Sequence, residues 1–151
     1  MANTQAMCDS FKQDLLNGIH AFGTAVVRAG TTADTFKAAL YLASATINNT
    51  TTAYTATGEV TGTGYTAAGV TVTNATAPAI TTPSAYWTPS ASFAWTGVTL
   101  STAFDTVLLY NSTQSNKAVS VHTFGSQTVT AGNFTLTMPT NAVSTALIRI
   151  V

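Results

Sequence analysis

The sequence predicts an all-β fold, an antiparallel sandwich or barrel of about eight strands with a short N-terminal α-helix. Thr makes up about a fifth of the 151 residues, and Thr suits pleated, half-buried strands. Apolar and polar residues alternate in several segments, which indicates strands. Gly, Pro and Asn interrupt the chain at short intervals with no helical pattern between them, so parallel crossovers are not expected. We expect a single domain, with residues 1–34 as helix and arm and residues 35–151 as the sandwich.

The N-terminal segment carries the pattern of the helix. From Asn3 or Thr4 as N-cap, apolar residues recur every three to four positions, and Asn17-Gly18 ends the pattern. The apolar stripe consists of Met7, Phe11, Leu15, Ile19 and Phe22. Such a helix can pack on its own sheet or dock on a neighbouring subunit. A membrane-surface helix is disfavoured because Lys12 is its only cation, whereas such helices are usually rich in Lys or Arg.

Four later segments alternate with a period of two and are predicted as strands. Residues 36–42 place Phe, Ala, Leu and Leu on an inner face and Lys, Ala and Tyr on an outer face. Residues 70–73, 93–96 and 134–138 alternate large apolar residues with Thr or Ala. These segments predict strands with one buried face.

Two runs are apolar on both sides, residues 104–110 and residues 146–151. Strands of this kind are typical of the centre of a sheet or of a sheet covered by a second layer. Breaks are expected at Gly125, at Gly132 and in the turn at residues 111–116. Residues 58–64 predict a hairpin or irregular β segment.

The least regular stretch is residues 74–89, which contain three prolines and Tyr86-Trp87. It predicts a long loop whose two aromatic residues pin it to the sandwich or to a neighbouring molecule. Tyr86 and Trp87 are therefore candidate contacts.

The titratable residues are few and scattered. His20 and His122 lie far apart, with no carboxylate or Cys at metal-ligand spacing, so structural or surface roles are expected. Cys8 lies beside the apolar stripe and is expected to be a small buried hydrophobic residue. This pattern predicts no catalytic residue, no metal ligand and no cofactor.

The carboxylates have expected roles in structure. Asp9 and Asp14 fit solvated helix positions, and Asp34 fits a turn before a strand. Glu59 and Asp105 lie in or beside strands, so each is expected to pair with Lys, Arg or backbone N–H groups.

The charge and cysteine content limit the kinds of partner and the compartment that we expect for this chain. Only 7% of residues are charged, the formal net charge is zero, and the basic residues form no patch that could neutralise a phosphate backbone. No apolar run reaches the roughly 18 residues of a membrane span. One cysteine excludes an intrachain disulfide, and no export signal is recognised, so synthesis in a reducing cytoplasm is expected. The composition favours repeated packing of many copies over binding to nucleic acid or membrane.

Several motifs resemble small virion proteins of tailed bacteriophages. They are Met7-Cys8-Asp9-Ser10-Phe11-Lys12, Gly18-Ile19-His20-Ala21-Phe22, Thr35-Phe36-Lys37-Ala38-Ala39-Leu40-Tyr41, Thr57-Gly58-Glu59-Val60, Gly62-Thr63-Gly64-Tyr65, Leu109-Tyr110-Asn111-Ser112 and Ala146-Leu147-Ile148-Arg149-Ile150. The resemblance implies a capsid cement or decoration protein, made in the bacterial host cytoplasm and placed on the capsid exterior. It also implies a jelly-roll-like sandwich that binds the major capsid protein and associates as a dimer or trimer. It brings no catalytic residues.

The expected function is therefore to stabilise a capsid shell without catalysis. The candidate assembly contacts are Met7, Phe11, Leu15, Ile19, Phe22, Tyr86 and Trp87. The alternative is a tail or fibre module that binds a host-surface glycan through Trp87, Trp95 and tyrosines.

Overall fold

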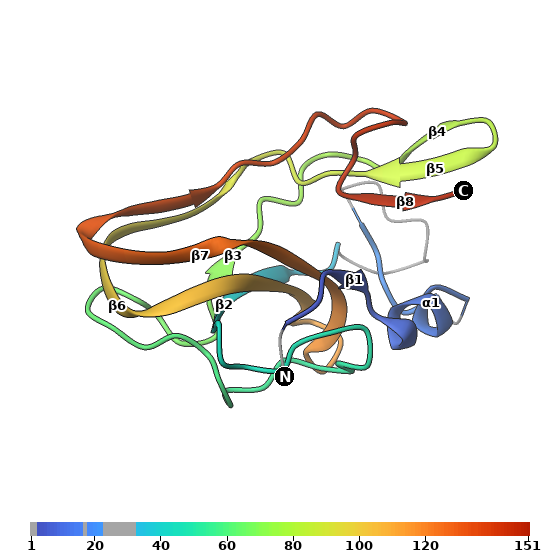
Figure 1. Cartoon of the computed structure of the whole chain (residues 1–151). Coiled ribbons are helices and arrows are strands. Elements are labelled where there is room, and N and C mark those ends of the chain that lie inside the picture. Colours follow the sequence, from blue (N-terminus) through green and yellow to red (C-terminus); the bar gives the residue numbers. More distant parts are fainter. Residues whose placement is uncertain (1–2, 17, 23–32) are drawn as a thin grey trace.

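A computed structural model describes residues 3–16, 18–22 and 33–151, which form eight β-strands and one α-helix (Figure 1). The elements are β1 (Ala6–Met7), α1 (Asp9–Leu16), β2 (Phe36–Leu42), β3 (Val70–Thr71), β4 (Ala79–Thr81), β5 (Ser84–Trp87), β6 (Phe93–Asn111), β7 (Lys117–Leu136) and β8 (Ile148–Ile150). They make a five-stranded sheet of order β1-β7-β6-β2-β3 and a three-stranded sheet of order β4-β5-β8. All these pairings are antiparallel. The predicted all-β, sandwich-like fold with a short N-terminal helix is confirmed.

The hairpin of β6 and β7 extends through much of the molecule. Figure 1 shows the two strands running side by side along the top, bending together at the left and returning through the five-stranded sheet. Their register shifts at five places, and such irregularities bend an antiparallel pair and increase its twist. The segments predicted as separate strands at residues 93–96, 104–110 and 134–138 therefore belong largely to two long strands.

Two predicted breaks lie inside β7. Gly125 and Gly132 do not end the strand, and Gly132 pairs with Val98 where the register shifts. Glycine inside a strand commonly marks a bulge or bend, which explains why these positions resemble turns in the sequence. The predicted turn between β6 and β7 is present at residues 112–116.

Strand β2 is buried on both faces, although the sequence predicts one outer face. Ala39 and Tyr41, assigned to that outer face, are both fully buried. β2 lies between β6 and β3 in the sheet, and residues 58–60 continue the pairing beyond β3, with Val60 N donating to Leu40 O at 3.0 Å. Residues 58–64 are thus an irregular β segment, as predicted, and they help to cover the centre of the sheet.

Gly69 allows the chain to approach β2 closely. Its φ is +71°, and a Cβ at this position would lie 1.9 Å from the carbonyl oxygen of Ala38. Both the backbone conformation and the lack of space require glycine.

The three-stranded sheet corrects two predictions. Residues 74–89 are not a long loop, because β4 and β5 form a hairpin within them. Residues 146–151 do not form a central strand, because among the described strands β8 pairs with β5 alone and lies at the edge of its sheet. Ile150 and Val151 are 49% and 86% exposed. Local hydrophobicity does not reveal whether a second strand lies beside a given one.

The N-terminal helix is shorter than predicted. Ala6 and Met7 are extended and pair with Val121 and Ser120 of β7, so the helix begins at Asp9. Gly18, with φ +67°, lies just beyond its end, as expected for a glycine after a helix. Ile19 and Phe22 therefore lie outside the helix, which ends before them.

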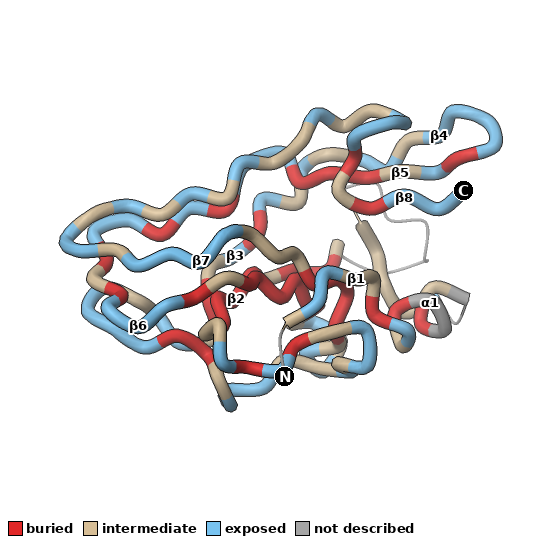
Figure 2. Tube along the Cα trace, viewed as in Figure 1, coloured by how far each residue is buried: buried red, intermediate tan, exposed pale blue. Residues whose placement is uncertain are grey.

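The buried residues gather where the layers face each other. Figure 2 shows burial concentrated in β2 and in the adjoining parts of β6 and β7, while the far end of the β6–β7 hairpin is mostly exposed. The core continues to Trp87 and Ile148 in the second sheet and to Cys8 and Phe11 near the N-terminus. Cys8 is buried, as predicted.

Candidate functional site

An apolar cavity of about 560 Å³ lies between the N-terminal segment and the three-stranded sheet. Its walls come from α1, residues 18–22, residues 77–78, β5 and β8. Five of the seven predicted contact residues line it, namely Phe11, Leu15, Phe22, Tyr86 and Trp87. The fold thus brings together the N-terminal segment and Tyr86-Trp87, which the sequence analysis proposed separately as assembly contacts.

Phe22 links the N-terminal segment to both sheets. Its ring centroid lies 4.6 Å from that of Phe36 in β2, in a stacked arrangement, and 4.6 Å from that of Trp87 in β5. Its ring also meets Phe11 of α1 edge-on at 5.9 Å. These contacts hold residues 18–22 against the core and fix one wall of the cavity.

Trp87 forms another wall and is held in one orientation. Its side chain is buried, and Nε1 donates a hydrogen bond to the carbonyl oxygen of Thr76 at 2.8 Å. The indole therefore presents its apolar surface to the cavity while its polar atom is satisfied elsewhere.

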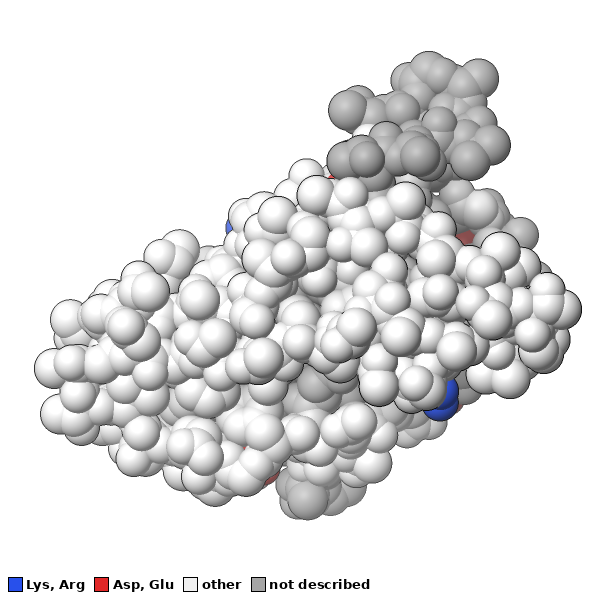
Figure 3. Space-filling model, turned by 90° about the horizontal axis from the view of Figure 1, so that it is seen from above, with Lys and Arg blue, Asp and Glu red and all other residues white. Residues whose placement is uncertain are grey.

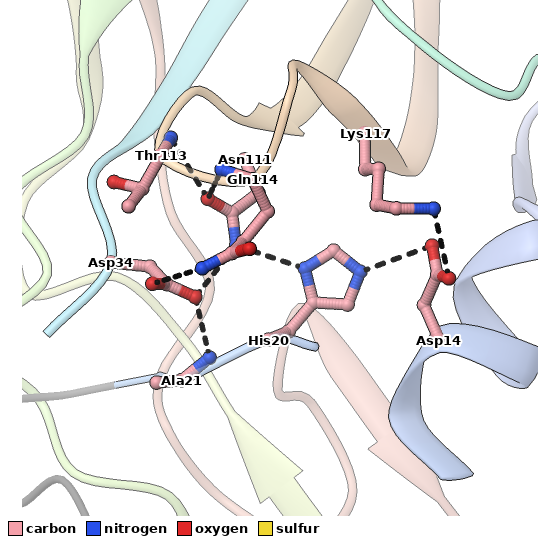
Figure 4. A network of polar contacts seen from close by, with 8 residues as sticks. All are labelled: Asp14, His20, Ala21, Asp34, Asn111, Thr113, Gln114 and Lys117. Atoms are coloured by element: carbon pink, nitrogen blue, oxygen red, sulfur yellow. Dashed lines mark hydrogen bonds and ion pairs between the residues drawn. The ribbon is translucent and has the colours of Figure 1, made fainter. Parts of the chain in front are cut away.

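A buried polar network adjoins the cavity (Figure 4). Asp34 Oδ2 accepts hydrogen bonds at 2.8 Å from Ala21 N and from Asn111 Nδ2, and Asp34 Oδ1 accepts one from Gln114 Nε2 at 3.2 Å. Asp34 was predicted to be a turn residue, yet it is only 3% exposed. Its carboxylate ties residues 18–22 to the end of β6 and the following turn.

The network fixes the tautomer of His20. Asn111 Oδ1 accepts hydrogen bonds from the backbone N–H groups of Thr113 and Gln114, so the amide nitrogen of Asn111 faces His20. That nitrogen lies 3.0 Å from His20 Nδ1, which must accept. The imidazole proton is then on Nε2, which points toward Asp14 Oδ2 at 3.8 Å.

Asp14 corrects another prediction. It was expected to be solvated, but its side chain is only 8% exposed, and Oδ1 accepts a hydrogen bond from Lys117 Nζ at 3.0 Å. The carboxylate lies between Lys117 and His20 (Figure 4). This pair joins α1 to β7.

A third buried carboxylate lies elsewhere, beside β2. Glu59 accepts hydrogen bonds from the hydroxyls of Tyr54 and Tyr65 at 2.6 and 2.8 Å, and from the backbone N–H of Ala68 at 2.8 Å. The backbone partner was predicted, whereas the two tyrosines were not. Burial, reinforced by the charge of Glu59, raises the pKa of Tyr54 to about 12. These hydrogen bonds hold residues 54–68 together, and the Tyr65 hydroxyl also accepts one from the backbone N–H of Leu40 in β2 at 3.1 Å.

Asp105, the other carboxylate beside a strand, has different partners from those predicted. Its Oδ1 accepts hydrogen bonds from Asn3 Nδ2 at 2.8 Å and from Thr106 Oγ1 at 2.6 Å. Side-chain amide and hydroxyl donors take the place of the expected Lys, Arg or backbone groups.

Ser120 and His122 lie at alternate positions of β7, with Ser120 Oγ 2.8 Å from His122 Nε2. Burial lowers the pKa of His122 to about 4, so the imidazole is neutral at pH 7. A Ser–His pair can act as nucleophile and base when a third group orients the histidine. Within the described residues, no carboxylate is hydrogen-bonded to His122, and Ser120 is buried. The geometry supports a structural pair.

Two predicted contact residues lie outside the large cavity. Met7 is half-buried in β1 and lines a smaller cavity beside His122, and Ile19 is half-buried after the helix. Sequence reasoning missed Ala85, Ile148 and Ile150 as parts of the large cavity. The register of β5 against β8 brings them there, and no local signal encodes that register.

Two features are missing from the described part of the chain, a cluster of metal-ligating side chains and a membrane-crossing helix. No group of three or more His, Cys, Asp or Glu side chains there could hold a metal ion. No helix there has the length and apolar character needed to cross a bilayer.

Comparison of the chain with protein-family models, with curated proteins and with solved structures gave no match. The surface and the cavity of the chain are therefore the features from which a function can be inferred.

Proposed function

We propose that this chain is a non-enzymatic virion protein, a cement or decoration protein that stabilises the capsid shell of a tailed phage. In this proposal it binds the major capsid protein on the capsid exterior and associates with copies of itself as a dimer or trimer. The observation that carries the proposal is the removal of charge from the surface of a β-sandwich.

Few of the charged groups whose side chains are described are fully exposed to solvent. Asp14, Asp34 and Glu59 are buried with the partners described above. Among charged residues whose side chains are described, only Asp9 and Arg149 are exposed. Figure 3 shows one face on which atoms of charged residues are almost entirely missing from view. Such a surface contacts its partners through hydroxyl, amide and apolar groups.

A surface of this kind suits dense, repeated attachment. Near-zero net charge gives little self-repulsion between adjacent copies. Each copy that binds only the assembled shell adds free energy against its disassembly. Because few surface ion pairs contribute, attachment should depend little on salt.

The glycan-binding alternative receives less support. Aromatic recognition of a sugar needs an exposed ring face, yet Trp87 and Trp95 are only 2% and 3% exposed. Trp95 offers no platform for stacking, and Trp87 offers only the part of its ring that lines the cavity.

The test compares particles assembled with and without the protein. We expect complete particles to resist heat and chelators better, and a density map to show the chain in many copies over the capsid. Attachment should survive an increase in salt. Equal resistance of both particles, or a few copies confined to the tail, would contradict the proposal.

A further inference from the structure

A smaller cavity, of about 340 Å³, lies where residues 146–148 approach β1 and β7. Its described walls come from residues 5–7, residues 120–122 and residues 146–148. Ile148 belongs to both cavities, because it also lines the large one. The smaller cavity therefore lies between the five-stranded sheet and the segment that carries β8 into the wall of the large cavity.

His122 is the only titratable side chain among the described residues that line this cavity, and none of them is Asp, Glu, Lys or Arg. The charged side chains on the packed segments bind other groups. Asp9, after β1, accepts from Asn49; Asp105 of β6 accepts from Asn3 and Thr106; Lys117 of β7 donates to Asp14; and Arg149 of β8 donates to the carbonyl oxygens of Val143 and Ser144. A positive charge on His122 would have no anionic partner in the described walls.

Residues 146–148 contact β7 without a hydrogen bond in the part of the chain that the structure describes. The backbone N–H of Leu147 donates to Thr88 Oγ1 at 2.9 Å. The backbone N–H of Ala146 donates to Ala142 O at 2.9 Å, and β8 pairs with β5. Packing of apolar groups thus holds this segment against β7, and a charge that needs hydration weakens such a contact.

Protonation of His122 would leave its hydrogen bond intact but add a charge. In the neutral imidazole, Nε2 lies 2.8 Å from Ser120 Oγ. A hydroxyl can donate or accept, so it can also bind the Nε2–H of an imidazolium. The cost therefore comes from the charge and the second N–H, which need water. In agreement, burial lowers the pKa of His122 from its ordinary value of 6.5 to about 4.

We propose that His122 is an acid-sensitive latch, whose neutral form lets residues 146–148 pack against β7 and whose protonation opens this contact to water and loosens β8 in the wall of the large cavity. The inference goes beyond the proposed function and does not depend on it, because it concerns the isolated chain.

The sign and size of the effect follow from linkage. The closed state, with residues 146–148 packed on β7, disfavours the imidazolium, so the contact keeps its full strength above pH 6.5 and weakens as pH falls toward 4. With a pKa of 6.5 in the open state and about 4 in the closed state, the ratio of open to closed molecules should rise about 100-fold between pH 7 and pH 4.

Amide hydrogen exchange of the purified protein tests the latch. His122→Gln stays neutral at every pH and keeps a side chain that can bind Ser120. Comparison of the two proteins at the same pH cancels the intrinsic exchange rate and the titration of the buried carboxylates. We expect equal protection of the Leu147 amide at pH 7 and about 100-fold lower protection in wild type at pH 4.

The Leu108 amide, in the buried centre of β6, is the internal control. Its protection should be the same in both proteins, so the ratio of Leu147 to Leu108 protection in wild type alone should fall over the same pH range. A difference below about threefold at pH 4 overturns the latch. Equal loss of protection at Leu147 and Leu108 also overturns it, because the opening would then be global.

The effect on the large cavity has its own measurement. Trp87 lines that cavity and pairs with Ile148 of β8. In a Trp95→Phe background only Trp87 fluoresces as an indole, and acrylamide should quench it more strongly at pH 4 when residue 122 is His than when it is Gln. Equal quenching at pH 4 would overturn the connection between His122 and the wall of the large cavity.

Discussion

Replacing Glu59 is expected to loosen the segment that covers β2. In Glu59→Ala, the hydroxyls of Tyr54 and Tyr65 and the N–H of Ala68 lose a charged acceptor. Hydrogen bonds to charged groups contribute about 1.5–3 kcal/mol each. Half-buried Tyr54 can regain a partner from water, so we expect a loss of about 4 kcal/mol in the free energy of unfolding.

The size of the effect should depend on what replaces the carboxylate. Glu59→Gln keeps an oxygen that can accept from Tyr65 and Ala68, and we expect a loss of about 1–2 kcal/mol because the charge is gone. The matched control is Asp9→Asn, at an exposed carboxylate, which should change stability by less than about 1 kcal/mol.

Urea unfolding at pH 7 measures these differences. Trp87 and Trp95 are both buried and report unfolding by fluorescence. For a chain of this size, 4 kcal/mol corresponds to a decrease in Tm of about 8–16 °C. A Glu59→Ala protein within about 1 kcal/mol of wild type would refute the conclusion that this carboxylate holds residues 54–68 together.

Three further predictions concern stability. Burial raises the pKa of Tyr54 to about 12, so the folded state holds its proton more tightly than the unfolded chain. The contribution of Tyr54 to the free energy of unfolding should be constant below about pH 10 and be lost as pH rises toward 12. Tyrosinate absorbance measures the titration, and coincident titration of folded and unfolded protein would contradict this prediction. Gly69→Ala should lower the free energy of unfolding by more than about 3 kcal/mol in urea titrations. Gly18→Ala also has positive φ, but its added Cβ would have no atom within 4 Å, so the loss should be about 1–2 kcal/mol. Equal losses would show that the contact of Gly69 with β2 is unimportant. Lys117→Met leaves the buried Asp14 charge without its cation and should lower the free energy of unfolding by about 3 kcal/mol. In a double-mutant cycle, adding Asp14→Leu should restore much of this stability. Additive losses would contradict coupling of the pair.

The sequence predicted several local features correctly. The alternation at residues 36–42 marks β2, the double-sided apolar run at 104–110 marks the centre of the large sheet, and Gly18 marks the end of the helix. Each of these depends on residues close together in the chain.

The errors share a different cause. Ala6–Met7 lies in an otherwise helix-like pattern but pairs with β7, and residues 79–87 form a hairpin around Pro83 whose second strand pairs with β8. Asp14 follows the pattern of a solvated helix position, yet Lys117, 103 positions later, buries and pairs it. In each case a distant segment supplied a partner that changed the environment of the residue.

The candidate site shows the same division. The sequence determined which side chains are apolar, which segments are extended and how little charge the chain carries, because composition and periodicity are local properties. Only the tertiary structure decided that Phe22 and Trp87 meet, that Asn111 fixes His20 from 91 positions away, and that Ile80, Ala85 and Ile150 stand in one row. Strand register and the burial of polar groups arise from packing between distant segments, so one cavity could be recognised only after the chain had folded around it.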